Sequence, residues 1–218
     1  MDTTMDTPFL SVYTPTYRRA DFLEKCKASI QMQTIADRIE HVIIYDHASL
    51  GVGGMFTDIK NHAQDVHGDY VFILSDDNVL YDALAVSELR DFIEMTEDPD
   101  VVIWRGIVPS HRTPTDAVWE HWPILGHIDL SNFIVRGDIW RAEAHNWKND
   151  YAADFYFINH LFESGRTFTW FDRLGYQALA VMKGATQEEW EDAGSPNIMA
   201  EQWRKAADHR RQLSRDSR

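Results

Sequence analysis

The chain has little cysteine and no long run of apolar residues. Its 218 residues include one cysteine, Cys26, so no intrachain disulfide can form, which agrees with a reducing compartment. No apolar run approaches the ~20 residues that a membrane-spanning helix needs. The opening segment MDTTMDTPF lacks the basic and apolar regions of a signal peptide. We therefore expect a cytoplasmic protein without stable membrane insertion.

Positive charge is also scarce. The chain has 21 Lys and Arg against 35 Asp and Glu, a net charge of −14 at pH 7. Phosphate contacts need clustered Lys and Arg, so this balance disfavours non-specific binding to nucleic acid or anionic lipid. Residues 203–218 are the exception, with six basic and two acidic side chains. Such a tail is most often a solvated helix end, and contact with a polyanion or a membrane is the alternative.

Repeats, low-complexity segments and Gly/Ser/Pro-rich linkers are absent, which predicts a single domain. The sequence has no Walker A motif. The GVGG segment at 51–54 lacks the spacing of a dinucleotide-binding GxGxxG, and we expect it to form a tight turn. A diphosphate bound by this chain would need another source of positive charge, such as a metal ion.

Apolar strands and amphipathic helices alternate through the first half of the chain. The predicted strands are 9–14, 41–46, 70–75 and 101–105, and the predicted helices are 21–32, 55–66 and 82–95. This alternation is typical of a parallel sheet covered by helices on both faces. Later elements are predicted as strands at 129–135 and 167–171, a helix at 151–162 and a polar helical segment from 187 onward.

Acidic residues follow two of the predicted strands. Asp46 ends the second, and Asp76 and Asp77 end the third. Ligands of such sheets bind outside the carboxyl ends of the strands, where these acids lie. Two adjacent carboxylates repel each other and lose hydration, so the arrangement needs a compensating group. A turn and cap device is the common use of SDDN, and a divalent-metal site is the alternative that the strand-end position favours. An acid–base pair is disfavoured because neighbours on a strand face opposite ways.

Aromatic and histidine side chains gather in the segment after residue 105. The members of this group are His111, Trp119, His121, Trp122 and His127. They either line a pocket that stacks on a sugar or a planar acceptor, or simply pack as core and pocket wall.

Three further residues have two interpretations each. Asp129, together with the neighbouring histidine at 127, is a minor candidate for metal ligation or for a catalytic base. Arg105 and Arg136 either bind a diphosphate or pair with surface acids, and the second use is more common.

Three segments in order resemble the amino-terminal half of glycosyltransferase family 2, the inverting transferases with a GT-A fold. They are SVYTPTYRRADFLEKCKASIQMQT, HVIIYDHAS and GDYVFILSDDN. The match covers roughly residues 9–95 and continues more loosely through 128–140 and 150–165. The resemblance implies an α/β fold of GT-A type, with a Rossmann-like, mostly parallel sheet flanked by helices.

The resemblance also implies how one GT-A domain divides. Residues 9–105 would form the nucleotide-sugar half, 106–186 the acceptor and catalytic half, and 187–218 a helical basic tail.

On the donor side, the resemblance assigns nucleotide contacts to Pro15, Thr16 and Tyr17, with Tyr17 stacking on the base. Asp46 resembles the strand-end acid that accepts a hydrogen bond from the base imide, which favours uracil or thymine over purines.

On the catalytic side, Asp76 resembles the acid beside the ribose and the metal, and Asp77 resembles the direct metal ligand. The implied cofactor is Mn²⁺ or Mg²⁺, with a nucleoside-diphosphate sugar as donor substrate. Asp154 resembles the base that deprotonates the acceptor hydroxyl.

The chain departs from the family pattern at several positions. His47 and Ala48 replace the usual Asp-Gly after Asp46, and Ser75 stands where the first Asp of an Asp-x-Asp motif is common. Ala153 replaces the Glu that usually precedes the base. Lys60 and Asn61 occupy the region of a frequent Arg/Asn pair.

We therefore predict a metal-dependent inverting glycosyltransferase that uses a nucleoside-diphosphate sugar, with UDP preferred. The alternatives are a nucleotidyltransferase and a non-catalytic module that binds nucleotide-sugar or glycan. The acceptor stays open among a glycan, a lipid-linked sugar, a protein side chain, a small metabolite and a hydroxylated nucleobase in DNA, although the negative charge does not favour DNA.

Overall fold

The computed structural model describes residues 7–46, 51–108, 111–150 and 152–179, which lie in one compact unit, Met1–Leu179. The predictions for the tail at 187–218 fall outside the described residues. The strands are β1 (Leu10–Thr16), β2 (Ile39–Tyr45), β3 (Tyr70–Ile73), β4 (Asn78–Leu80), β5 (Val101–Val108), β6 (His111–Thr113), β7 (Phe133–Arg136) and β8 (Phe168–Ala178). The helices are α1 (Ala20–Gln31), α2 (Gly51–Asn61), α3 (Ala85–Met95), α4 (Gly137–Glu143) and α5 (Ala153–Glu163). Short 3₁₀ turns cover Ala36–Arg38, Asp116–Val118 and Ala144–Asn146.

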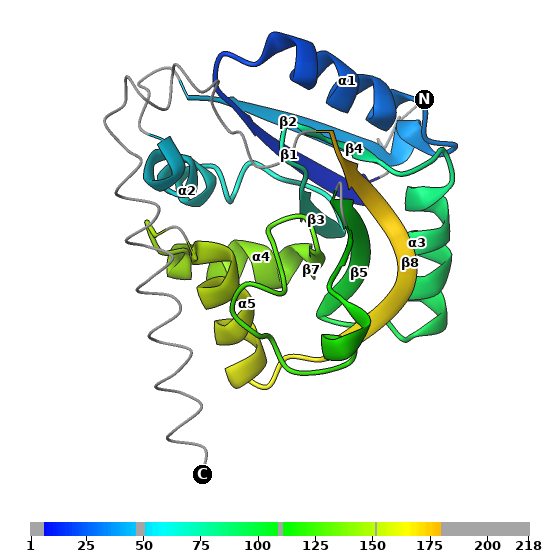
Figure 1. The fold of residues 1–218 in the computed structure, drawn as a ribbon, viewed down its shortest axis with the longest axis vertical. Helices are drawn as coiled ribbons and strands as arrows, with labels where there is room; N and C mark the ends of the chain where they lie inside the picture. Colours follow the sequence, from blue (N-terminus) through cyan, green and yellow to red (C-terminus); the bar gives the residue numbers. More distant parts are fainter. Residues whose placement is uncertain (1–6, 47–50, 109–110, 151, 180–218) are drawn as a thin grey trace, which may run out of the picture. The chain divides into compact units, whose positions relative to one another are not determined.

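The strands form one mixed sheet in the order β2-β1-β3-β7-β5-β8-β4, with β6 paired to β5 (Figure 1). β1 is parallel to β2 and β3, and β5 is parallel to β8. β7 is antiparallel to both of its neighbours, β3 and β5, so these two run the same way. In the described part of the chain, β1, β2, β3, β5 and β8 therefore share one direction. The predicted α/β class, a mostly parallel sheet flanked by helices, is confirmed.

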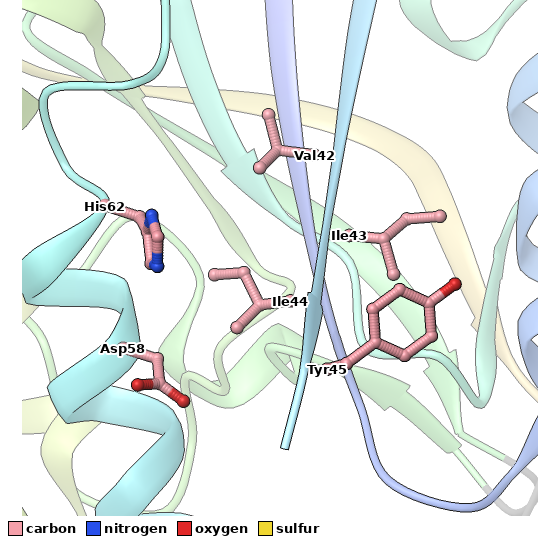
Figure 2. A pocket seen from close by; sticks show the side chains of 6 residues that line it. All are labelled: Val42, Ile43, Ile44, Tyr45, Asp58 and His62. Atoms are coloured by element: carbon pink, nitrogen blue, oxygen red, sulfur yellow. The ribbon is translucent and has the colours of Figure 1, made fainter. Parts of the chain in front are cut away.

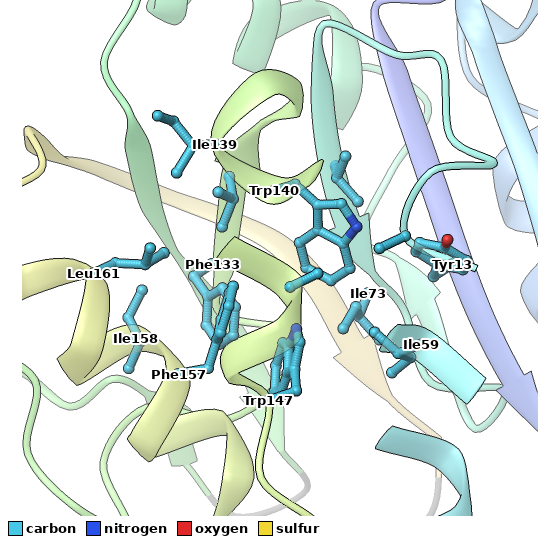
Figure 3. Packing of buried hydrophobic residues seen from close by; sticks show 14 of the residues in the cluster. Tyr13, Ile59, Ile73, Phe133, Ile139, Trp140, Trp147, Phe157, Ile158 and Leu161 are labelled. Carbon is cyan, nitrogen blue, oxygen red and sulfur yellow. The ribbon is translucent and has the colours of Figure 1, made fainter. Parts of the chain in front are cut away.

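Helices cover both faces of the sheet, since every residue of β1 and β3 is buried and successive side chains of a strand point to opposite faces. On one face α2, α4 and α5 pack through a group of large aromatic and aliphatic side chains (Figure 3). Its tightest ring contact stacks Trp147 on Phe157 with centroids 4.2 Å apart. On the other face α1 and α3 pack on β1, β3 and β5, where Phe72 meets the buried Trp104 edge-on at 5.0 Å. Cys26 of α1 is buried in this second layer.

The prediction of a tight turn at 51–54 is wrong, because α2 begins at Gly51. Phe56 and Ile59 are buried on one side of α2 and anchor the helix to the sheet. Packing of such an apolar face outweighs the low helix propensity of glycine.

Candidate functional site

The carboxyl ends of β1, β2 and β3 lie at one edge of the sheet, as their parallel register requires. Thr16, Asp46 and the pair Asp76–Asp77 follow or end these strands. Because β7 runs in the opposite direction, its amino-terminal end comes to the same edge and brings Asp129 with it. This edge therefore gathers polar residues from both halves of the chain, and we refer to it as the site edge.

An arginine holds the acid pair in place. Asp76 is fully buried, and its Oδ2 accepts hydrogen bonds from Thr16 Oγ1 at 2.7 Å and from Arg19 Nε at 3.1 Å. Arg19 Nη2 forms an ion pair with Asp76 Oδ1, and Nη1 donates to Asp77 Oδ2 at 2.9 Å. The group that compensates the two carboxylates in this structure is thus a guanidinium, which sequence analysis did not single out.

Burial raises the pKa of Asp76 above its ordinary value, and the nearby Asp77 raises it further. Arg19 and the Thr16 hydroxyl oppose this rise because both stabilise the ionised form. The same four-residue segment also closes a turn, since the Asn78 N–H donates to the Ser75 carbonyl at 2.9 Å. SDDN therefore serves as a turn as well as presenting two acids to the site edge.

A pocket of about 250 Å³ opens between the ends of β1 and β2, lined by Thr16, Tyr17, Arg18, Tyr45 and Asp46. Three of the predicted nucleotide contacts, Thr16, Tyr17 and Asp46, meet here. The Asp46 N–H extends the ladder between the two strands by donating to the Thr16 carbonyl at 3.0 Å. We call this hollow the donor pocket.

Pro15, also predicted to contact the nucleotide, is buried within β1 and pairs with Ile44 of β2. It does not line the donor pocket, and its place in the structure is that of a backbone support for the residues that follow it.

A second hollow of about 210 Å³ lies between β2 and α2 (Figure 2). Its lining residues are Val42, Ile43, Ile44, Tyr45, Asp58 and His62. Asp58 of α2 and His62, the residue after this helix, project toward the side of β2 that carries Ile44, whereas Tyr45 projects from the other side (Figure 2). Tyr45 lines both hollows, so this groove adjoins the donor pocket.

Asp154 lies in the first turn of α5, where its Oδ1 accepts the N–H of Phe155 at 2.7 Å. Burial raises the pKa of Asp154 to about 7, and the negative charge of Asp129 adds to the rise. The backbone hydrogen bond opposes the shift but does not cancel it. The result is a carboxyl group that exchanges its proton near neutral pH, as a general base must.

The structure makes Asp129 a stronger candidate for a functional residue than the sequence did. The hydroxyl of Tyr176, in β8, donates to both of its oxygens at 2.8 and 2.7 Å, and the Ser131 N–H donates to Oδ1 at 2.9 Å. Burial raises the pKa of Asp129, and the charge of Asp77 raises it further. Asp129 thus interacts electrostatically with Asp77 on one side and with Asp154 on the other. From the sequence, Asp129 is only a minor candidate, and no pattern in the sequence points to Tyr176.

Arg105 and Arg136 both pair with acids. Arg105 is almost fully buried, and its guanidinium contacts Asp116 at 2.9 Å and Asp172 at 2.5 Å. Arg136 contacts Asp138 at 2.7 Å, and Asp100 as well. Of the two interpretations, diphosphate binding and pairing with acids, both arginines follow the second, since their partners are protein carboxylates.

The aromatic group after residue 105 divides into packed and exposed members. Trp119 lies between the Arg105 guanidinium, 3.9 Å from its ring centroid, and Trp170, 5.0 Å away edge-on. Trp122 is 63% exposed and meets His121 edge-on. His111, in β6, is exposed too. Trp119 therefore packs against other side chains of the protein, whereas Trp122 is accessible to a ligand.

In the described ranges no three or more His, Cys, Asp or Glu side chains gather as they would to hold a metal ion. A divalent ion at Asp76 and Asp77 would have to complete its shell with ligand and water oxygens, as Mg²⁺ and Mn²⁺ do on nucleotide phosphates. The acid pair fits that kind of ion and not a structural metal. Among the same residues, no helix is long and apolar enough to cross a membrane.

No family model matches the sequence, and no curated protein matches it at a significant level. Solved structures do resemble it. S. aureus TarS 1–349 in complex with UDP superposes with a TM-score of 0.60 at 13% identity, over 80% of this chain and 61% of that one. The mannosyltransferase PcManGT from Pyrobaculum calidifontis, solved with GDP-Man and Mn²⁺, gives 0.60 at 13% identity, over 82% and 59%.

The chain thus spans about three-fifths of the length of TarS 1–349. Likeness at this low identity bears on architecture, and it confirms the expectation drawn from the motifs: the chain has a GT-A fold.

Proposed function

We propose that the protein is a metal-dependent, inverting glycosyltransferase of the family 2 type. It moves a sugar from a nucleoside diphosphate, UDP by preference, to a hydroxyl acceptor. One observation supports the proposal: the pocket with Tyr17 and Asp46 and the acid pair Asp76–Asp77 lie at one edge of the sheet, and the carboxyl of Asp154, whose pKa burial raises to about 7, interacts electrostatically with Asp129 of that edge.

The donor's base occupies the donor pocket. Tyr17 stacks on the base, and the Asp46 carboxylate accepts its imide N–H, which purines do not offer in the same place. The solved complexes of S. aureus TarS with UDP and with UDP-GlcNAc, and of PcManGT with GDP-Man, support a nucleoside-diphosphate sugar as the donor class.

Asp76 and Asp77 would hold a divalent ion, Mn²⁺ or Mg²⁺, together with the bound donor. Carboxylate oxygens are the ligands these ions prefer, and the donor's phosphate oxygens supply the remainder. When bound, the ion neutralises the charge that the leaving diphosphate acquires. The Mn²⁺ in the PcManGT complex supports a divalent ion in this fold.

Asp154 is the base. The acceptor hydroxyl attacks the anomeric carbon from the face opposite the diphosphate, a carbon–oxygen bond forms, and the bond to the diphosphate breaks. The hydroxyl proton passes to an Asp154 oxygen. The raised proton affinity of this carboxyl favours the transfer, because a surface aspartate is too weak a base to hold the proton. Trp122 offers an exposed aromatic face for the acceptor.

A thermal-shift panel of UDP-, GDP-, TDP- and CDP-sugars, each with and without Mn²⁺, tests the donor. A ligand that binds only the native state raises the Tm, and we expect the largest rise with a UDP-sugar plus Mn²⁺. No shift with any sugar nucleotide would contradict the proposal.

Release of UDP from the selected donor tests catalysis. Wild type is expected to release UDP, whereas Asp154→Asn binds the donor equally well and loses at least 100-fold in rate. Glu163→Gln, at an exposed acid in the last turn of α5, is the matched control and keeps wild-type turnover. Donor binding without UDP release in wild type would favour a binding module, and pyrophosphate release from a nucleoside triphosphate would favour a nucleotidyltransferase.

A further inference from the structure

Arg19 reaches the acid pair from the donor side of the site edge. It is the residue immediately before α1 and follows Thr16, Tyr17 and Arg18 of the donor pocket. Its side chain is 24% exposed, so solvent and ligands reach the guanidinium. Arg19 thus connects the candidate metal ligands to the place predicted for the nucleotide.

The guanidinium uses all three of its nitrogens on the two carboxylates. Nε and Nη2 contact the two oxygens of Asp76, and Nη1 contacts Oδ2 of Asp77. Such a fork-shaped match to carboxylates is the geometry in which arginine binds most strongly. It is also built into the fold, because Asp76 is completely buried and needs a counter-charge in the absence of any ligand.

A divalent ion and Arg19 compete for the same oxygens. Metal coordination to Asp77 Oδ2 would use the lone pairs that the Nη1–H occupies, and it would place a charge of +2 within a few ångströms of a charge of +1. The two carboxylates together carry a charge of −2. They can neutralise either the divalent ion or Arg19, but not both cations at once.

We propose that Arg19 is the resident counter-ion of Asp76 and Asp77 in the donor-free protein, and that a divalent ion binds the pair by displacing it. The inference rests on the proposed function, which places that ion at this pair. The displaced guanidinium remains tethered beside the donor pocket, where a diphosphate offers it new oxygens. Metal and nucleotide consequently bind with positive coupling, since each releases Arg19 for the other.

The test is a titration of each protein with MnCl2 alone, with free Mn²⁺ followed by its EPR signal. We expect weak binding to wild type and at least tenfold tighter binding to Arg19→Gln. Lys25→Gln is the matched control: it removes one positive charge from an exposed side chain of α1 that lies over the Phe22 ring and does not line the donor pocket. It should bind Mn²⁺ within twofold of wild type.

Arg19→Gln leaves the buried Asp76 without its partner and lowers the Tm. Mn²⁺ should restore much of that loss and raise the wild-type Tm far less. Arg19→Lys covers the case in which the glutamine variant does not fold. Its single ammonium cannot bridge both acids as the fork does, so we expect Mn²⁺ binding several-fold tighter than in wild type.

Equal Mn²⁺ affinity in wild type and in the folded Arg19 variants would overturn the inference, as would weaker or undetectable binding in the variants. A repeat titration with UDP present should tighten Mn²⁺ binding to wild type at least tenfold and to Arg19→Gln by much less. The nucleotide-free titration needs no donor. If sugar nucleotides fail to bind at all, the proposed function fails, while the competition between Arg19 and Mn²⁺ is still decided.

Discussion

Burial gives Asp154 a proton affinity unlike that of a surface aspartate. Its pKa is about 7 in the folded protein, against an ordinary value of 3.8. Ionising Asp154 above pH 4 therefore costs more free energy in the folded state than in the unfolded chain. Asp154 stays protonated to a higher pH in the folded state than in the unfolded chain. The free energy of unfolding therefore falls as the pH rises from about 4 to about 7, and it stays lower above that.

Asp154→Asn is therefore expected to stabilise the protein at pH 8 and to leave it nearly unchanged at pH 4. The gain is on the order of 2 kcal/mol, less than the full shift implies because the side chain is only partly buried. Urea unfolding at the two pH values measures it, with Glu163→Gln, at an exposed acid at the end of α5, as the control that shows no such difference. An equal change at both pH values would mean that Asp154 does not titrate near neutrality.

Tyr176 is expected to matter through Asp129. Tyr176→Phe removes the hydroxyl that donates to both Asp129 oxygens and leaves a half-buried carboxylate short of a donor. We expect a loss of about 1–3 kcal/mol in unfolding free energy. The loss grows with pH, because the missing hydrogen bond stabilised the ionised form, and urea unfolding at pH 5 and pH 8 measures it. Tyr81→Phe, at an exposed position, should cost little at either pH.

Among the elements, β5 and β8 make an unusually close contact. A register shift occurs around Arg105, and on the opposing strand Gly175 lies flat against the indole of Trp104. A Cβ at Gly175 would overlap that ring, which is fully buried and whose N–H donates to the Ser131 carbonyl at 2.8 Å.

Gly175→Ala should consequently cost more than Gly165→Ala. The first forces Trp104 out of its packed position, at about 3 kcal/mol. The second only strains a residue with φ of +74° in open space, at about 1 kcal/mol. Chemical denaturation of the two variants side by side compares them, and a smaller cost at Gly175 would show that the indole gives way freely.

Local patterns predicted the elements that carry the site well. Asp46, Asp76 and Asp77 were placed at strand ends because an apolar run followed by an acid marks a carboxyl edge in the sequence itself. Arg19 and Tyr176 could not be found this way. Arg19 lies 57 residues from Asp76, and Tyr176 lies 47 from Asp129, so only the assembled sheet brings these partners together. β4 escaped prediction because three residues are too few for a period-2 pattern.

At the scale of the whole molecule, the charge of −14 sets how the protein responds to salt. Mutual repulsion among excess carboxylates opposes the compact state, and dissolved ions screen it. The Tm at pH 7.5 is expected to rise by a few degrees between about 10 mM and about 150 mM NaCl, where the Debye length falls to roughly 8 Å. Differential scanning calorimetry checks this, and a falling Tm would indicate that attractive ion pairs outweigh the excess charge.

The strand β7 joins two earlier strands, β3 and β5, into one sheet. It supplies the hydrogen-bonding partner that both β3 and β5 need, yet it is made after both of them in chain order. A polypeptide that ends at residue 105 would leave one edge of β3 and one edge of β5 without a hydrogen-bonding partner. The middle of the sheet can form only after residue 136 has been synthesised. An exchange of the residues beyond β5 for those of another protein would therefore have to supply a replacement for β7, because this strand forms the middle of the sheet.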